Sequence, residues 1–201
     1  MFVLIRENHE GDFALSDHIG EIGWNRSVDD ATKIVEQLSM KNLMELLQRA
    51  PDLETADIVS TAQEEIWMAH RDPAIRWVLQ NAITHMAGGN TMKAFESFMH
   101  ILDNEDSGYA EAWNRGSMCK YIMGDFDSSL FMAERALELV HQHTQAIRGL
   151  GMIHSQRNDL TSAVKNYRRV LELNPWSSAS ADLLTYSTMA IWENNKTGTS
   201  K

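Results

Sequence analysis

Apolar residues recur with helical spacing over most of the chain. From about Val28 they return every three to five positions, as at Ile34, Leu38 and Leu43, which is the period of an amphipathic helix. A second helix is predicted over residues 54–71. Only 3 of the 201 residues are proline, and this scarcity favours long uninterrupted helices over a turn-rich β architecture.

Residues 1–27 show no sustained period and contain several glycines. We expect a poorly ordered arm there, with a short extended piece near residues 2–5. The next clear boundary is Asp72-Pro73, since Asp accepts hydrogen bonds from free helical amides and Pro is tolerated at the first helical position. That helix is expected to end at Gly88-Gly89 and to be followed by a helix over residues 91–102.

Two later segments of the chain repeat each other. One begins at Ala110 and the other at Thr144, and both end in the letters LEL. Each places an Asp directly after a residue that can stop a helix, Gly124-Asp125 in the first and Asn158-Asp159 in the second. Each segment therefore predicts a helix, a short turn and a second helix.

A period of 34 with this content is typical of a helical solenoid, and the residues resemble the tetratricopeptide-repeat family. The repeat from Thr144 carries the family residues Ile147, Leu150, Gly151, Ala163, Tyr167 and Pro175, with Asn158 where Gly is usual. The repeat from Ala110 is less typical, because Ser117 and Ser129 stand at its two small positions. A further repeat from Ile75 matches at Ala82, Gly89, Ala94 and Phe98, and leaves one extra residue in the loop before Ala110.

The resemblance implies an all-α fold, a right-handed superhelical array of antiparallel helix pairs. Three repeats are expected over residues 73–176, at about 75–109, 110–143 and 144–177. An acidic helical pair over residues 28–72 and a capping helix over residues 177–194 would cover the two ends, and residues 195–201 are expected to form a disordered tail.

In the family, the first helix of each repeat lines the concave side, where partner proteins bind. The residues of this chain that fall there are Arg76, Leu79, Ile83, Met86, Asn114, Met118, Tyr121, Ile122, Arg148 and Met152. This surface is rich in methionine, which adapts to varied shapes, so an apolar or amphipathic segment of a partner is the expected ligand, with Arg148 steering an acidic end. Alternatively, the acidic helices of residues 28–72 or the arm of residues 1–27 fold over this groove and fill it. The sequence favours neither the open groove nor the filled one.

Some family members hold a chaperone's terminal carboxylate with a clamp of Lys, Asn and Arg. The clamp needs Lys and Asn at the positions where this chain has Leu79 and Ile83. Asn114 and Arg148 alone do not complete such a clamp, although Arg148 can still contact a carboxylate. A structural or assembly-factor subunit that uses its outer faces and termini remains an alternative function.

The net charge of −10 is concentrated at one end: residues 1–72 hold 15 acids against 6 bases. Without a basic excess to neutralise phosphates, nucleic-acid binding is disfavoured. The longest apolar runs are too short to span a bilayer. The acidic start of the chain is unlike a targeting peptide, and two glycosylation triplets, at Asn25 and Asn195, have no other secretory feature beside them. We expect an intracellular, soluble protein, cytoplasmic rather than in an organelle.

Candidate chemistry is sparse. The single cysteine, Cys119, excludes an internal disulfide and fits a small buried residue better than a nucleophile. His141 and His143 could offer two metal nitrogens, but no Cys or carboxylate cluster lies near them in the sequence, and a polar turn between repeats is favoured. We therefore expect no enzyme activity and no cofactor, with a metal-binding protein or enzyme around these histidines as the alternative from another class.

Overall fold

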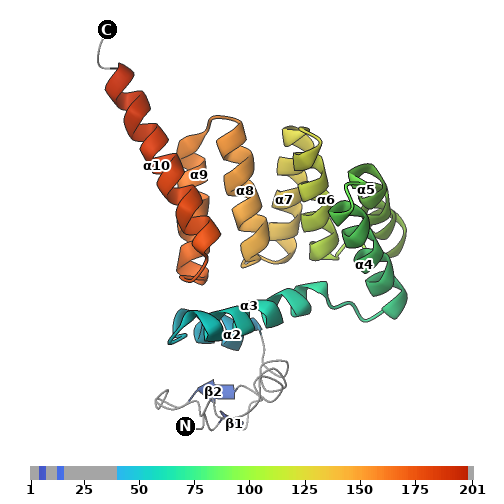
Figure 1. Cartoon of the computed structure of the whole chain (residues 1–201). Coiled ribbons are helices and arrows are strands. Elements are labelled where there is room, and N and C mark those ends of the chain that lie inside the picture. The colour runs from blue at the N-terminus through green and yellow to red at the C-terminus, as the bar shows by residue number, and fades with distance from the viewer. Residues whose placement is uncertain (1–4, 8–12, 16–39, 199–201) are drawn as a thin grey trace. The chain divides into compact units, whose positions relative to one another are not determined.

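The computed structural model describes residues 5–7, 13–15 and 40–198 of the chain (Figure 1). The chain divides into two compact units, Met1–Ile66 and Trp67–Lys201. The elements run in the order β1 (Ile5–Glu7), β2 (Phe13–Leu15), α2 (Met40–Gln48), α3 (Leu53–Met68), α4 (Pro73–Ala87), α5 (Thr91–His100), η1 (Ile101–Glu105), α6 (Ala110–Ile122), α7 (Phe126–Leu139), α8 (Thr144–Gln156), α9 (Leu160–Leu173) and α10 (Ser178–Gly198).

The first unit contains a short hairpin, α2 and α3 as far as Ile66. Strands β1 and β2 pair antiparallel, with Ile5 opposite Leu15 and Glu7 opposite Phe13. Strand β1 includes Ile5, the last residue of the extended piece expected near residues 2–5, and residues 2–4 lie outside the described residues. The rest of the expected arm, the helix start at Val28 and the triplet at Asn25 lie outside the described residues. Helix α2 buries Leu43 and Leu47 completely, as the apolar spacing of this segment predicts.

The second unit is a row of antiparallel helix pairs, α4 with α5, α6 with α7, and α8 with α9, followed by α10 (Figure 1). Helices α6 and α8 begin at equivalent positions of consecutive repeats, and so do α7 and α9. An aspartate caps the second helix of two repeats: Asp125 accepts from the Ser128 amide and Asp159 from the Ser162 amide, both at 3.1 Å. Asp72 likewise caps α4 by accepting from the Ala74 amide at 2.8 Å.

A left-handed residue closes the first helix of each repeat. Gly89 has φ of +81° and Gly124 has φ of +78°, and Asn158, at the equivalent place, has φ of +60°. Within the described residues Asn158 is the one non-glycine residue with positive φ. Asparagine is among the residues that tolerate this conformation, so the departure from glycine keeps the turn.

The two helices of a repeat approach closely at small residues. An added Cβ at Gly151 would lie 2.4 Å from Cε1 of Tyr167, so the tyrosine ring packs directly on the backbone of α8. In the middle repeat Ser117 and Ser129 take the corresponding small positions, and each hydroxyl donates to the other's backbone carbonyl at 2.8 Å. The reciprocal pair explains how two serines replace smaller residues while leaving no buried hydroxyl unpaired.

Two predicted boundaries change. The helix expected over residues 91–102 is regular only to His100, and a π-helical turn, η1, follows it. In that turn the Asp106 amide donates to the Ile101 carbonyl at 2.8 Å, five residues back. A π turn takes up one additional residue, which accounts for the residue that the repeat alignment leaves over before Ala110. At the other end, α10 continues to Gly198, so residues 195–198 are helical where a disordered tail was expected.

No helix in the described part of the chain combines the length and the apolar character that crossing a bilayer requires.

Candidate functional site

The first helices of the three repeats carry the surface that the family resemblance marks for binding. The structure removes two of its expected residues. Leu79 is 1% exposed and belongs to the core of the first repeat. Asn114 is 9% exposed, and its amide donates to Oε2 of Glu111 at 3.1 Å. Leu79 is therefore covered by the core, while Asn114 keeps only a small exposed part, which lines the cleft described below.

The remaining expected residues have exposed surface. Arg76 is exposed, and Ile122 is 55% exposed. The other six, which are half-buried, are Ile83, Met86, Met118, Tyr121, Arg148 and Met152. The first helices α4, α6 and α8 therefore carry apolar side chains that are packed against the protein on one side and exposed to solvent on the other. Partly exposed apolar side chains of this kind are common in protein interfaces.

A narrow cleft between α6 and α8 brings three of these residues together. Met118, Tyr121 and Met152 line it, with Gly149 among the residues from α8. The cleft encloses about 10 Å³, roughly the space of one water molecule. At Gly149 an added Cβ would meet no atom within 4 Å, so the glycine keeps this part of the α8 surface open.

Arg148 is available on this surface, whereas Met86 and Cys119 contact each other. Arg148 makes no hydrogen bond or ion pair with the part of the chain that the structure describes, which leaves its guanidinium available to an acidic ligand. Met86 instead packs on Cys119, with its sulfur 3.8 Å from the thiol. Burial raises the pKa of the Cys119 thiol to about 11, so the thiol stays protonated and unreactive at neutral pH, as the sequence predicts for a small buried residue.

The strongest electrostatic feature is a buried network centred on Glu111, whose side chain is 1% exposed. One carboxylate oxygen, Oε1, accepts from Nε of Arg115 at 2.6 Å. The other, Oε2, is 2.9 Å from Nε2 of His143, a residue with no exposed surface. Burial tends to raise the pKa of Glu111, but the hydrogen bond from His143 and the charge of Arg115 outweigh burial and hold the pKa below its ordinary value.

His143 uses both ring nitrogens inside this network. Nδ1 accepts from the Ala146 amide at 3.4 Å and caps the start of α8. Nε2 must then carry the proton that is donated to Glu111, so the neutral tautomer satisfies every polar atom of the ring. Trp67, the first residue of the second unit, stacks on the imidazole with ring centroids 4.3 Å apart and planes 13° from parallel.

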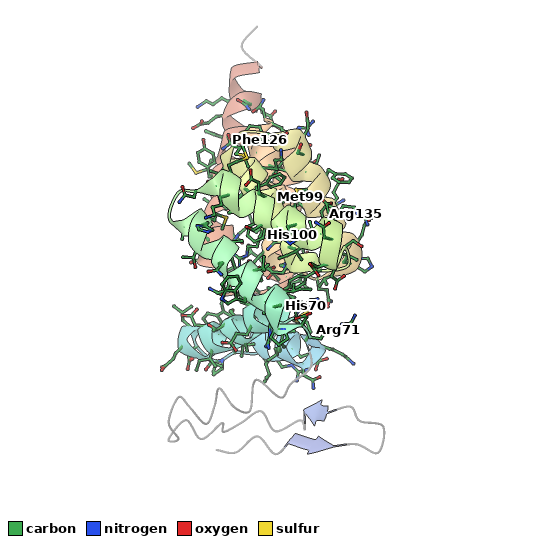
Figure 2. All side chains as sticks on the ribbon, turned by 90° about the vertical axis from the view of Figure 1, so that its right-hand side faces the viewer. His70, Arg71, Met99, His100, Phe126 and Arg135 are labelled. Atoms are coloured by element: carbon green, nitrogen blue, oxygen red, sulfur yellow. The ribbon has the colours of Figure 1, made fainter. Side chains whose placement is uncertain are left out.

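A second histidine is used in the same way at the start of this unit. His70 Nδ1 accepts from the Asp72 amide at 3.0 Å, and Nε2 lies 3.0 Å from the Asp106 carboxylate, which lowers the pKa of Asp106. Close by, the Tyr109 hydroxyl donates to the Met68 carbonyl at 2.6 Å. Figure 2 labels His70, which lies beside Arg71 before α4 begins. These bonds tie the segment before the first repeat to the loop that follows it.

This geometry does not support the metal alternative at His141 and His143. Both nitrogens of His143 are taken by Glu111 and Ala146, while Nδ1 of His141 faces the Leu137 carbonyl at 2.7 Å. The described residues contain no group of three potential metal ligands.

Sequence reasoning missed the Glu111 network because the partners are 32 residues apart. A usable signal was present: Glu111 is the second and His143 the last residue of one predicted repeat, and in a stacked repeat these positions lie near each other.

A separate aromatic hollow is formed by residues of α5, α6 and α7. It encloses about 460 Å³ between α5 and α7 and is lined by Phe95, Met99, Trp113, Lys120, Asp127, Ser128, Phe131 and Met132. Phe131 is 57% exposed, and the Lys120 ammonium lies 4.6 Å from the centre of the Phe95 ring. Figure 2 labels Met99 on α5 and Arg135 on α7.

No family model matches the sequence. A TPR repeat-containing protein of Rhizobium etli is 30% identical over 67 residues, which are 33% of this chain and 33% of that protein. The aligned segment thus spans about a third of the relative's length.

Solved structures share the arrangement of helices. The first TPR of Spaghetti (RPAP3), bound to the HSP90 peptide SRMEEVD, gives a TM-score of 0.56 at 19% identity, over 58% of this chain and 92% of that one. MamA gives a TM-score of 0.55 at 15% identity, over 84% of this chain and 86% of that one. At identities this low, the similarity shows the fold alone. The shared arrangement of helices confirms the predicted solenoid of tetratricopeptide repeats.

Proposed function

We propose that this tetratricopeptide-repeat protein is a non-catalytic interaction module, and that it binds an apolar or amphipathic segment of a partner protein on the face formed by α4, α6 and α8. The observation that carries the proposal is the strip of partly exposed apolar residues on consecutive first helices. Ile83 of α4, Met118 and Ile122 of α6, and Met152 of α8 belong to it. Solvent contact of such a strip is unfavourable, and a bound apolar segment would remove it.

The chemistry of the strip favours a helix or a short apolar peptide over a small molecule. Methionine side chains adapt to partners of different shape, and the cleft at Gly149 is too small to hold more than a methyl-sized group. Specificity would then come from side chains that project from a larger ligand. Arg148, which precedes the cleft residue Gly149 on α8, supplies a cation for an acidic residue or a terminal carboxylate of that ligand.

The burial of Leu79 and Asn114 argues against a carboxylate clamp of the chaperone-binding kind. Leu79 replaces the required lysine and lies in the core, and Asn114 is held by Glu111. Ile83 replaces the required asparagine, so Arg148 lacks the polar partners that the clamp needs. The peptide-bound relative therefore supports binding of a peptide in general, while the residues of this chain favour apolar contacts.

Three buried groups with a shifted pKa support a role without catalysis. Glu111, Cys119 and Tyr109 each have a shifted pKa, and each lies inside helix-packing contacts instead of facing a cleft. Titratable groups that act on substrates are usually placed in an accessible pocket.

A second candidate is a structural or assembly-factor subunit that uses the outer side of the repeats. The aromatic hollow between α5 and α7 favours it, because Phe131 exposes more than half of its surface there. One experiment separates the two candidates. It compares a variant of the inner face with a variant of the outer hollow at positions of nearly equal exposure, Ile122 at 55% and Phe131 at 57%.

The experiment is affinity purification with quantitative mass spectrometry from the native cell, using the wild type, Ile122→Asp combined with Met118→Glu, and Phe131→Asp. We expect partners to be lost with the inner-face variant and kept with Phe131→Asp. Circular dichroism and a melting curve confirm that each variant is folded. An unchanged partner list from a folded inner-face variant refutes the proposal, and loss with Phe131→Asp alone selects the outer-face alternative.

A further inference from the structure

Helix α10 occupies the place of the first helix of a fourth repeat. It begins at Ser178, one repeat period after the start of α8, as α8 begins one period after α6. In the third repeat the second helix covers the first: Tyr167 packs on Gly151, and its hydroxyl lies 3.1 Å from the Ser155 hydroxyl. The corresponding residues of α10 are Thr185 and Met189, and both are exposed.

The exposed side of α10 is strongly apolar at its centre. Tyr186 is 70% exposed, Met189 is 58% exposed and Trp192 is 62% exposed. The opposite side of the helix buries Ser180 and Ser187 and half-buries Leu183 and Leu184 in the packing of α10 on α9. Three large apolar side chains on one face of a helix are more than the isolated exposed residues that soluble proteins normally tolerate.

The spacing of the residues on this face is symmetric about Met189. The α10 stripe, as we name it, consists of Asp182, Thr185, Tyr186, Met189, Trp192, Glu193 and Lys196, all of them exposed. The successive spacings are 3, 1, 3, 3, 1 and 3 positions. Such spacing is that of a heptad seam, which packs against a second helix of the same kind.

The chemistry of the stripe is complementary to itself when two copies run antiparallel. A two-fold axis at Met189 places Met189 on its counterpart and Tyr186 against Trp192 of the other copy. It also places Asp182 against Lys196, so that opposite charges meet at both ends of the pair. Symmetric dimers have this property, because residue i contacts residue j while j contacts i.

A parallel pair would be disfavoured by the same residues. It would place Asp182 on Asp182, Glu193 on Glu193 and Lys196 on Lys196, and like charges in register repel. Lys196 already lies along the stripe, with its ammonium 5.0 Å from the centre of the Trp192 ring. Its charge is thus held near the apolar centre, where an incoming Asp182 would meet it.

We propose that the α10 stripe is a dimer interface, and that its partner is the α10 stripe of a second copy of this chain in antiparallel orientation. One helix pair is a small interface, so we expect dissociation in the micromolar range. The interface uses residues distinct from those of α6 and α8 that carry the proposed partner site. Ile122→Asp therefore leaves the dimer unchanged, and failure of one proposal does not affect the other.

The first test is sedimentation equilibrium of the full chain over a concentration series, with Met189→Glu and the matched control Met92→Glu. Met92 is an equally exposed methionine, 60% against 58%, on α5. The two-fold axis brings both substituted carboxylates together, so we expect Met189→Glu to weaken dimerisation by about a hundredfold or more and Met92→Glu to leave it unchanged. Both positions are exposed, and circular dichroism verifies the fold of each variant.

The second test reverses the charges of Asp182 and Lys196 and reports whether the two α10 helices run antiparallel. Asp182→Lys and Lys196→Asp are each expected to weaken the dimer by about fivefold or more, since each exposed attraction becomes a repulsion twice per dimer. The double variant Asp182→Lys/Lys196→Asp is expected to recover wild-type affinity. A wild-type chain that stays monomeric at hundreds of micromolar, a dimer insensitive to Met189→Glu, or a double variant without recovery overturns the proposal.

Discussion

The carboxylate of Glu111 and the imidazole of His143 form a hydrogen bond of 2.9 Å between the first turn of α6 and the residue that precedes α8, with both side chains almost fully buried. This bond joins the start of one repeat to the start of the next. It also determines which nitrogen of His143 is left to cap α8, so a single contact fixes both the packing and the local helix start.

Replacing Glu111 by alanine is expected to destabilise the protein by about 3 kcal/mol, because it leaves Arg115 without its carboxylate and the His143 donor unpaired in a dry site. Urea denaturation followed by circular dichroism measures the loss. Glu138→Ala is the control: that carboxylate pairs with Arg135 on the surface, with its side chain 60% exposed, and its removal is expected to change stability by less than about 0.5 kcal/mol. Equal effects of the two substitutions would contradict the role of the network.

The same carboxylate predicts a pH dependence. The folded pKa of Glu111 lies below its ordinary value of 4.5, so between the two values the unfolded chain binds more protons than the folded one. The stabilisation is therefore present above pH 4.5 and is lost as the pH falls through the lowered folded pKa. The free energy of unfolding of the wild type should fall more steeply below pH 4.5 than that of Glu111→Gln. Parallel curves for the two proteins rule out this linkage.

Two glycines of α8 should respond in opposite directions to alanine. At Gly151 the added methyl meets the Tyr167 ring at 2.4 Å, and we expect a loss of about 1–3 kcal/mol from overpacking. At Gly149 no atom lies within 4 Å, so alanine should stabilise the helix by up to about 1 kcal/mol. The melting temperatures of the two variants provide the comparison. A stabilised Gly151→Ala would show that α8 and α9 are not in close contact at Tyr167.

Asn158, at the turn between α8 and α9, predicts opposite effects of glycine and alanine. Its φ of +60° is unfavourable for a residue with a Cβ, and more so for alanine than for asparagine. We expect Asn158→Gly to be at least as stable as the wild type and Asn158→Ala to lose about 1 kcal/mol. Thermal unfolding of the two variants side by side tests the left-handed turn, and greater stability of the alanine variant would exclude it.

Much of the fold could be predicted from local signals. Asp72 caps α4 as the sequence predicts, and Gly124 and Asn158 turn the chain where a helix stop is expected. The candidate surface was less accessible to prediction. The family alignment places Leu79 and Asn114 on the concave side together with Met118 and Ile122. It does not say how much of each side chain the neighbouring helix buries.

The amino-acid sequence by itself determined the repeat period, the helix ends and the small residues where helices meet, because these depend on interactions between residues close together in the chain. The tertiary structure alone decided that Glu111 and His143 share one buried network, that Leu79 and Asn114 are covered, and that Tyr186, Met189 and Trp192 are not. Burial and long-range pairing depend on which helix stacks on which face, and a residue's own neighbours in sequence carry little of that information.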